Sequence, residues 1–440
     1  MCFDVGVDRD ALAVVPEAAA GVRSAETALD RAQLPTRLAA FRALRSQPFR
    51  IYFAGQVASA SGTFLQSTAI GWLVFQLTGS ATSLGLVIAA GGLPSLLLGP
   101  WGGSIADRVD LRRLLIATQT AFGLLAVALW IAAASGSATV ALIVTLNVVG
   151  GFVQIVDSPA RQAFVSALVP PDDLASAVSL NGVVMNSARV VGPALAGALI
   201  VTVGTTPCFA VNAVSYAAVI VALIAIRPLT AGRPPHKAGS GVRDGLHYAR
   251  GRQQLWLPLL MMSLVGLFAF NFAVVLPVFA SKTFHGTGGT YGLMSTLLSV
   301  GSILGSLGVG LIHHPRRVYL VAACVAFGVF LALTAAAPNV ALACVGLALT
   351  GAAAFCFVTL CSTTLQLHSS SAYRGRIMAL WVFVYIGTTP IGSVLTGWIT
   401  QAAGPRTALL LGAGSCLIAA GLGARVHTPP HPDAALTDLN

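Results

Sequence analysis

Apolar runs long enough to cross a lipid bilayer recur along the whole chain, and they restrict what it can fold into. Twelve such runs occupy residues 50–76, 84–106, 112–134, 138–161, 175–202, 206–226, 255–281, 289–312, 317–337, 339–366, 374–400 and 406–425. About 20 helical residues cover the ~30 Å hydrocarbon core of a membrane. Because lipid offers no hydrogen bonds, each run must pair its own backbone groups, which favours helices. The pattern predicts an all-α membrane protein with twelve transmembrane helices.

The composition excludes most other classes of protein. Of the 440 residues, 56% are apolar and only 9% are charged, whereas soluble proteins carry about 25% charged residues. The net charge of +11 does not indicate a nucleic-acid partner, because the basic residues are spread through short loops. Basic residues in such loops typically set the orientation of a protein in the membrane and lie near anionic lipid head groups. We therefore expect membrane lipids as neighbours and no nucleic acid.

Motifs for catalysis, cofactors and metals are absent from the sequence. There is no phosphate-binding Gly-x-x-x-x-Gly-Lys-Ser/Thr loop, no His-Glu-x-x-His and no persuasive Ser/His/Asp set. The seven cysteines show no Cys-x-x-Cys spacing, and six of them lie in apolar runs. They are typical of small buried residues rather than metal ligands or disulfides. We expect no enzyme activity, no cofactor and no metal.

The basic residues also predict the orientation of the chain. With both termini on one side, 22 of the 25 Lys and Arg residues fall on that side. Only Lys282 and Arg406 fall on the other, and Arg189 lies inside a span. Lys and Arg in short loops mark the cytoplasmic face. The sequence predicts a multi-pass protein of the cell (inner or plasma) membrane with both termini in the cytoplasm.

The longest internal polar segment divides the chain into two similar halves. We expect an N-terminal cytoplasmic tail (1–47), a first six-helix bundle (48–226), a cytoplasmic linker (227–254), a second six-helix bundle (255–425) and a C-terminal cytoplasmic tail (426–440). Residues 242–252 of the linker are compatible with a surface helix. Glycine-rich segments precede Arg112-Arg113 in the first half and Arg316-Arg317 in the second. This diverged internal repeat predicts two pseudo-symmetric bundles.

The short loop between the second and third runs is the most distinctive motif. Five of the eleven residues from Gly103 to Arg113 are charged. The string resembles the signature loop of the major facilitator superfamily, Gly-x-x-x-Asp-Arg-x-Gly-Arg-Arg, although Val109-Asp110-Leu111 replaces the inner glycine. That variant resembles the drug and siderophore exporters of the superfamily, as in the enterobactin-exporter and macrolide-efflux branch. The other matching pieces are Gly55-Gln56, Trp72-Leu73-Val74, Asp157-Ser158-Pro159-Ala160-Arg161, Gly192-Pro193 and Arg374-Gly375-Arg376.

The resemblance implies the fold of the major facilitator superfamily and a conformational latch on the cytoplasmic face. The latch residues carried over are Gly103, Asp107, Arg108, Arg112, Arg113, Asp157, Arg161 and Arg374. Asp107 would be stabilised by the positive N-terminal end of the helix that begins at Arg374. The alternative is that these are only topology charges at a helix turn. The resemblance also implies a proton-driven cycle, for which Asp157 is the only membrane carboxylate to consider besides Asp107.

Polar residues on the helical spans predict a central substrate cavity. Gln56, Ser59, Thr63 and Gln66 share one face of the first span, and Asn147 and Gln154 share a face of the fourth. Further candidates are Asn186, Arg189, Asn271, Thr363, Gln366 and Tyr385. Amides facing lipid are costly, so these faces should point inward. Taken singly, each amide is more typical of a helix–helix contact than of a ligand contact, so the prediction rests on the set as a whole.

Arg189 lies near the middle of the fifth span. A charge at that depth costs ~2.5–3.5 kcal/mol or more, so it requires a wet cavity or a partner. One interpretation is a contact for an anionic substrate. The other is a cation bonded to carbonyl groups or to Asn147 or Gln154. Nearby, Gly192, Pro193 and Gly197, with Pro390 in the second half, predict helix bending and close packing.

The resemblance, taken with these features, implies a monomeric secondary-active exporter of a small amphipathic or anionic molecule, such as a drug, macrolide or siderophore, working by alternating access. A lipid or lysophospholipid flippase of the same fold is one alternative, and the charge at Arg189 suits it too. A non-transporting membrane sensor or scaffold is another, although no large soluble domain supports it. The sequence does not identify the cargo.

Overall fold

The computed structural model describes residues 41–106, 109–226, 242–310, 316–370 and 373–425, and all regular structure within them is helical. The first half contains α3 (Gln47–Thr78), α4 (Ala81–Ala106), α5 (Leu111–Ala134), α6 (Val140–Ala167), α7 (Leu174–Thr202) and α8 (Thr206–Ala225). The second half contains α10 (Gln253–Phe268), α11 (Phe272–Val278), the π-helical turn η4 (Phe279–Thr283), α12 (Gly288–Val309), α13 (Arg317–Ala336), α14 (Val340–His368), α15 (Arg374–Ala403) and α16 (Pro405–Arg425). The short helices η2 (Arg42–Arg45), η3 (Pro171–Asp173) and α9 (Val242–Arg250) lie outside these spans.

The helices confirm the predicted membrane fold. In the described residues, eleven stretches are long and apolar enough to cross a bilayer. The twelfth span is α3, whose 32 residues give it ample length. Its polar side chains, including Gln56 and Gln66, lower its hydropathy below that of the other spans.

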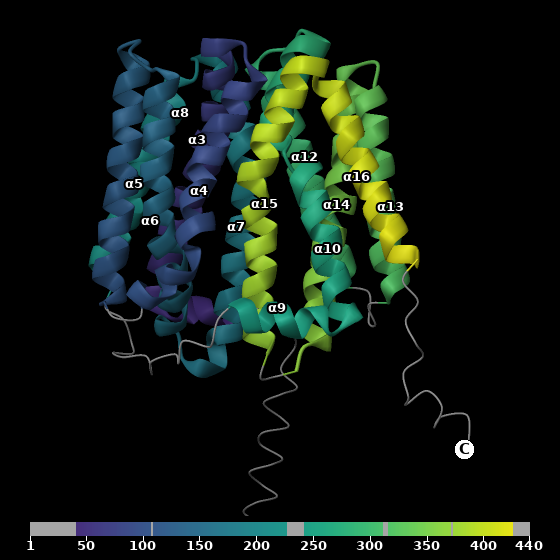
Figure 1. The fold of residues 1–440 in the computed structure, drawn as a ribbon. Helices are drawn as coiled ribbons and strands as arrows, with labels where there is room; N and C mark the ends of the chain where they lie inside the picture. Colours follow the sequence, from purple (N-terminus) through teal and green to yellow (C-terminus); the bar gives the residue numbers. More distant parts are fainter. Residues whose placement is uncertain (1–40, 107–108, 227–241, 311–315, 371–372, 426–440) are drawn as a thin grey trace, which may run out of the picture.

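The two halves repeat the same helix pairings. Helix α5 packs on α8 as α13 packs on α16, and α4 packs on α6 as α12 packs on α14. Helix α3 contacts α7 and α8, and its counterpart α10 contacts α15 and α16. Figure 1 shows the resulting bundles side by side, with α7 and α15 near the boundary between them. The pseudo-symmetric pair of bundles is therefore present in the structure.

The repeat extends to single side chains. The Arg112 Nε at the start of α5 donates a hydrogen bond of 2.7 Å to the Leu223 carbonyl in the last turn of α8. The Arg317 Nε at the start of α13 donates one of 2.7 Å to the Gly423 carbonyl near the end of α16. Each arginine thus satisfies a carbonyl that its neighbouring helix leaves unpaired.

The seventh span is interrupted, which the apolar pattern of 255–281 did not indicate. Helix α10 ends at Phe268 and α11 begins at Phe272. At the break, the Asn271 side-chain nitrogen donates to the Leu267 carbonyl at 2.8 Å. Its oxygen accepts from the Ser393 hydroxyl of α15 at 3.3 Å. These bonds give the interrupted backbone and the buried amide partners inside the bundle.

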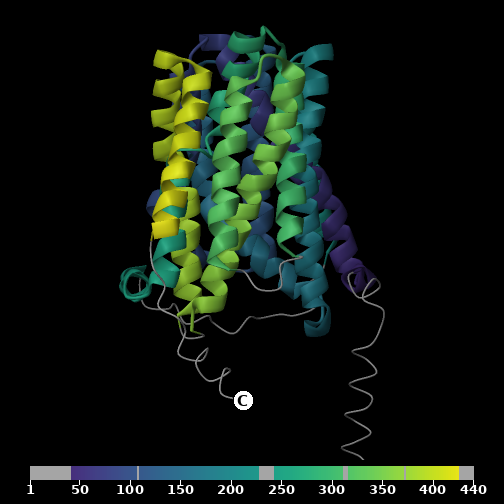
Figure 2. The same cartoon turned by 90° about the vertical axis from the view of Figure 1, so that its right-hand side faces the viewer.

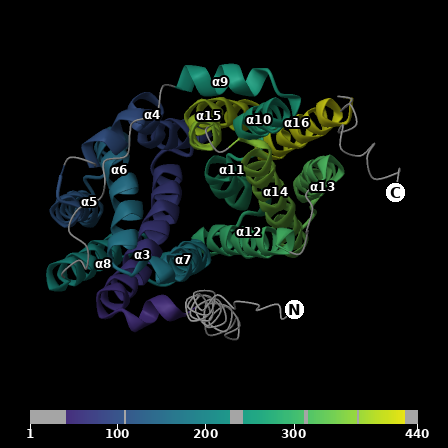
Figure 3. The same ribbon diagram turned by 90° about the horizontal axis from the view of Figure 1, so that it is seen from below.

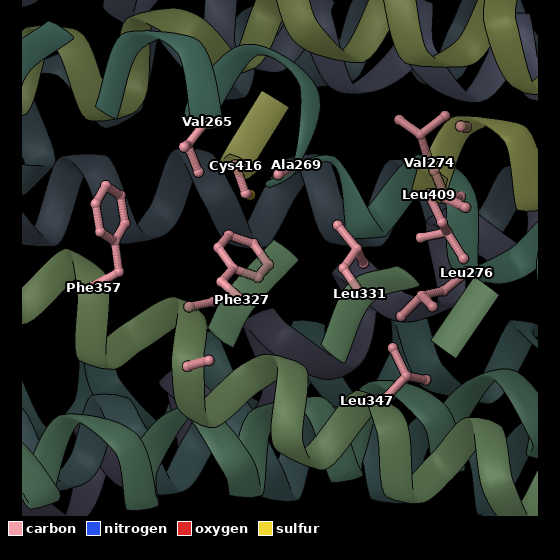
Figure 4. Packing of buried hydrophobic residues seen from close by; sticks show 14 of the residues in the cluster. Val265, Ala269, Val274, Leu276, Phe327, Leu331, Leu347, Phe357, Leu409 and Cys416 are labelled. Carbon is pink, nitrogen blue, oxygen red and sulfur yellow. The ribbon is translucent and has the colours of Figure 1, made fainter. Parts of the chain in front are cut away.

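The second half has a dense apolar core. Phe327 and Leu331 of α13 pack with Phe357 of α14, Cys416 of α16 and Val265 of α10 (Figure 4). All cysteines in the described part of the chain are unpaired, and most are buried. This matches the expectation that they serve as small apolar residues.

Helix α9 lies across one end of the bundle, seen end-on in Figure 2, and we call this the α9 end and the other the far end. Its Tyr248 ring stacks on Tyr373, with centroids 4.1 Å apart and planes 2° apart. Arg252 lies 4.1 Å over the Tyr248 ring and Arg376 lies 4.8 Å over the Tyr373 ring. The Tyr248 hydroxyl also donates to Ser370 at 3.1 Å. This cation–aromatic column fastens the linker to the start of α15.

Two helix pairs join the halves, and Figure 3 shows α7 beside α12 and α4 beside α15. On the first pair, a Cβ added to Gly292 of α12 would lie 2.4 Å from the Gly197 Cα of α7. Trp72 of α3 stacks on Tyr291 of α12 at 6.2 Å beside this contact. Gly197 lies near the end of α7 and Gly292 near the start of α12, so this contact belongs to the far end.

The second pair also meets toward the far end. A Cβ on Gly85 of α4 would lie 2.3 Å from the Ser393 carbonyl of α15, and one on Gly92 would lie 3.0 Å from Pro390. The Ala81 backbone N–H donates to the Gln401 side chain at 2.9 Å. We call these two glycine-rich contacts, α7 with α12 and α4 with α15, the far-end gate. In this structure both contacts are closely packed.

Candidate functional site

Arg189 of α7 lies between the two halves. Its guanidinium carbon is 5.7 Å from the ring centre of Phe64 on α3 and 5.1 Å from that of Phe355 on α14. The side chain is half-buried, and among the described residues it has no carboxylate and no hydrogen-bond partner. Aromatic faces stabilise a cation but leave its N–H donors free.

Neither Asn147 nor Gln154, the alternative partners expected for Arg189, forms a hydrogen bond with it in the described structure. The Asn147 side-chain nitrogen donates to the Ile143 carbonyl of its own helix at 2.8 Å, and Gln154 lines a separate pocket. The cation bonded to these amides is therefore not seen, and the contact with an anionic substrate remains a prediction.

Aromatic side chains of the second half continue the surface around Arg189. The Phe270 ring lies 6.3 Å from Phe355 and 6.2 Å from Tyr385, both edge-to-face. Tyr385 in turn stacks on Trp381 at 6.0 Å. A single cation against an aromatic wall suits a molecule that combines an anionic group with an apolar body.

A pocket of about 270 Å³ is lined by helices of the first half, with Ala273 of α11 as its one lining residue from the second half. Four of the predicted cavity residues line it: Thr63 and Gln66 of α3, and Asn147 and Gln154 of α6. Phe122 of α5 and Tyr216 of α8 also line it, with stacked rings 5.8 Å apart. Part of each predicted polar stripe thus faces one interior space, whereas Gln56 and Ser59 do not line this pocket.

A buried polar network lies one turn beyond that pocket on α6. Asp157 is fully buried and pairs with Arg161. Its other carboxylate oxygen accepts from Thr118 and from the Gln119 side chain of α5, both at 2.7 Å. The Gln119 oxygen has no hydrogen-bond partner in the structure. The carboxylate is fully engaged, while the neighbouring amide keeps an unused acceptor.

Arg161 extends this network to α3. It donates to the Gln56 side-chain oxygen at 3.3 Å, and the Gln56 nitrogen donates to the Tyr52 hydroxyl at 2.8 Å. The predicted cavity residue Gln56 therefore connects the ion pair to the helix that also carries Thr63 and Gln66.

The other predicted latch residues are dispersed in this structure. Asp107 and Arg108 lie outside the described residues, and Gly103 falls in the last turn of α4. Arg112 bonds the end of α8, as described above, while the Arg113 backbone N–H donates to the Asp110 side chain at 2.8 Å. Arg374 is exposed as the first residue of α15. The latch remains a prediction.

The remaining predicted residues occupy varied settings. Ser59 is buried, Thr363 is half-buried, and Asn186 and Gln366 are exposed. A Cβ on Gly192 would lie 2.5 Å from the Phe64 Cβ, so this glycine lets α7 approach α3. Gly197 serves the α7–α12 contact, Pro193 lies beside it, and Pro390 packs on Gly92.

Phe64, Phe355, Thr118 and Gln119 were not predicted as site residues. A phenylalanine within an apolar span has no sequence signal that separates an aromatic wall from a lipid-facing surface. Thr118 and Gln119 do carry a signal, because they are adjacent polar residues within the apolar third run.

Comparison with solved structures identifies the fold. The chain superposes on a bacterial homologue of the human lysosomal transporter Spinster, in an inward-facing and unoccupied conformation, with a TM-score of 0.69. That match covers 87% of this chain and 99% of the other at 13% identity. The D-xylose-proton symporter matches with a TM-score of 0.67 and 15% identity, over 87% of this chain and 97% of the other. The molecule has the fold of a major facilitator transporter.

Comparison of sequences then defines the family. The model of the transmembrane secretion effector family of the major facilitator superfamily matches residues 38–440, and the chain belongs to this family of transporters.

Curated relatives are similar at low identity. The staphyloferrin A transporter of Staphylococcus aureus is 26% identical over 59% of this chain and 66% of its own length. The multidrug efflux pump Tap of Mycobacterium tuberculosis is 25% identical over 83% of this chain and 90% of the pump. The enterobactin exporter EntS of Citrobacter koseri is 26% identical over 80% of this chain and 86% of the exporter.

Proposed function

We propose that this transporter is a secondary-active exporter of a small amphipathic or anionic molecule. The observation that carries the proposal is Arg189, a membrane-embedded cation held between Phe64 and Phe355 without a carboxylate or hydrogen-bond partner among the described residues. A substrate anion would supply the missing counter-charge, and the aromatic wall would hold its apolar body. The names of the relatives support export of molecules of this kind.

Alternating access is the mechanism we propose. The basic residues favour a cytoplasmic α9 end, so the closed far-end gate corresponds to an inward-facing state in the cell membrane. Cargo then reaches Arg189 from the cytoplasm. In the outward-facing state the halves meet at the α9 end, where Asp107 faces the positively charged start of α15 at Arg374. This latch replaces the far-end gate in that state.

Protons are the proposed driving ion, and Asp157 is the proposed carrier. Protonation of Asp157 removes the charge that holds Arg161, so the arginine is released toward Gln56 and α3. The unused Gln119 oxygen supports this role, because an amide that turns over can accept a hydrogen bond from the protonated carboxyl group. The protonation state is thereby linked to the helix that lines both Arg189 and the first-half pocket.

Counterflow in proteoliposomes tests the substrate class. Arg189→Ala should slow counterflow of anionic catechols, with 2,3-dihydroxybenzoate as the first probe, by about tenfold or more, since a charge-assisted hydrogen bond is worth ~1.5–3 kcal/mol. Arg189→Lys keeps the charge and should retain more activity. Counterflow of an uncharged compound should stay within about twofold. Equal losses for both compounds would refute the role of Arg189.

A pH gradient tests the proton proposal. Asp157→Asn keeps a side chain that can hydrogen-bond at this position but cannot take up a proton. We expect counterflow without a gradient to survive in this variant and stimulation by an imposed pH gradient to disappear. Stimulation equal to that of the wild type would exclude Asp157 as the carrier.

A further inference from the structure

The pocket in the first half and the Arg189 surface lie on different faces of α3. Thr63 and Ser67, one helical turn apart, line the pocket, as does Gln66. Phe64 instead turns its ring to Arg189. Neighbouring residues of a helix point about 100° apart, so α3 separates two interior surfaces of different character.

The pocket offers hydrogen-bonding groups that the protein leaves uncommitted. The Gln66 oxygen accepts from Asn212 at 2.8 Å, while its N–H groups have no hydrogen-bond partner among the described residues. The Asn147 nitrogen bonds its own helix, which leaves the oxygen available. Gln154 is exposed to this space, and no hydrogen bond of its amide occurs within the described structure. Donors and acceptors thus face the same cavity.

The pocket carries no charge. Its described lining comprises amides, hydroxyls, glycines, apolar side chains and the Phe122–Tyr216 pair, with no acidic or basic residue. A buried charge without a counter-charge is strongly unfavourable, whereas a neutral polar group is accommodated by amide partners. The surface therefore favours an uncharged ligand with hydrogen-bonding groups on an apolar frame, opposite to the preference of Arg189.

One wall of the pocket belongs to the far-end gate. Leu84, Ile88 and Gly91 of α4 line the pocket. Gly85 and Gly92 of the same helix contact α15. Because one helix provides both surfaces, separation of α4 from α15 would displace a wall of the pocket. This coupling distinguishes the pocket from a passive packing defect.

We propose that this pocket is a second ligand site, separate from Arg189, for a small uncharged molecule that carries hydrogen-bond donors and acceptors on an aromatic or apolar frame. The volume of about 270 Å³ lies just below the ~300–1,000 Å³ typical of ligand pockets, so the occupant is small. The participation of this second site in transport rests on the proposed function, whereas the binding of a ligand at the site does not.

Equilibrium binding of radiolabelled chloramphenicol to the purified full chain tests this site. Chloramphenicol is uncharged and combines an aromatic ring with an amide and hydroxyl groups. Asn147→Leu and Gln154→Leu each remove hydrogen-bonding groups from the pocket and should raise the Kd about threefold to tenfold. Gln254→Leu makes the same kind of change at an exposed position outside the pocket lining and should leave the Kd within about twofold. Arg189→Ala should also leave it within about twofold.

Binding of 2,3-dihydroxybenzoate to the same preparations separates this inference from the proposed function. The pocket variants should bind this anion as the wild type does, which also shows that they are folded. If chloramphenicol does not bind the wild type, if the pocket variants bind it normally, or if Arg189→Ala weakens it equally, the second site is refuted. If the anion binds without regard to Arg189, the proposed function fails while the second site stands.

Discussion

Gly292→Ala is expected to open the far-end gate. The added Cβ would lie 2.4 Å from the Gly197 Cα and 2.9 Å from both the Gly197 nitrogen and the Pro193 carbonyl oxygen. All three atoms are backbone, so no flexible side chain can move aside. Ordinary van der Waals contact begins at 3.4 Å, so α7 and α12 must separate by about 1 Å.

The size of the effect follows from this overlap. Overpacking of a well-packed contact typically costs ~1–3 kcal/mol. The contact joins the two halves rather than helices within one half, so the cost falls on the state in which the far end is closed. The ratio of open to closed gate should rise roughly 5- to 150-fold. Gly308→Ala is the matched control on the same helix, because its added Cβ meets no atom within 4 Å.

Spin-label distances across the far end measure this shift. Labels at Ser137 and Ala336, both exposed, report on the first and second halves respectively. In Gly292→Ala the distance distribution should gain a longer component that wild type and Gly308→Ala lack. An unchanged distribution in a correctly folded variant would refute the assignment of this contact as a gate, as would the same change in Gly308→Ala.

Three further predictions concern the supporting structure. Asp157→Ala removes the fully buried partner of Arg161, whose own side chain is 21% exposed, and should reduce the unfolding free energy in detergent by ~3 kcal/mol, the low end for breaking a buried ion pair; a loss no larger than that of exposed Asp172→Ala would contradict this. Tyr248→Ser removes the stacked ring and the hydrogen bond to Ser370, together worth ~2 kcal/mol, and should speed tryptic cleavage at Arg250 and Arg252 about 30-fold. Tyr319→Ser, on the exposed side of α13, is the control, and equal cleavage of the two variants would show that the column does not hold α9. Arg112→Leu and Arg317→Leu should each lower the thermal unfolding temperature by similar amounts, equivalent to ~1–2 kcal/mol, and a large effect in only one would argue against equivalent roles in the two halves.

The spans were predictable because each is a continuous apolar run that can be seen in the local sequence. The ends expected for the third run, 112–134, and the ninth, 317–337, agree within a residue with α5 and α13. The interruption between α10 and α11 was not predictable, because Phe268, Phe270 and Phe272 continue the apolar pattern through it. The break depends on Ser393, which lies over 100 residues away and bonds Asn271. Contacts between distant segments of this kind leave no local pattern.

The candidate site was predictable only in part for the same reason. The stripe from Thr63 to Gln66 and the pair Asn147 and Gln154 stand out as polar residues in apolar helices, and the structure places them in one pocket. Helical spacing cannot assign them to that pocket rather than to the Arg189 surface, because the assignment depends on how α3 rotates against α6 and α7. Phe64 and Phe355 give Arg189 its surroundings, yet in sequence they resemble any lipid-facing phenylalanine.

The most direct test of alternating access is to lock the far-end gate covalently and measure transport. A Cβ on Gly288 of α12 would lie 3.2 Å from the Ile200 Cβ of α7, so Ile200→Cys/Gly288→Cys should cross-link the halves after a small adjustment. Gly346→Cys/Thr334→Cys, at 3.3 Å within the second half, is the matched control. Oxidation of the first pair should abolish counterflow until a reductant is added, while the control keeps transporting. Full counterflow through the cross-linked first pair would contradict the account.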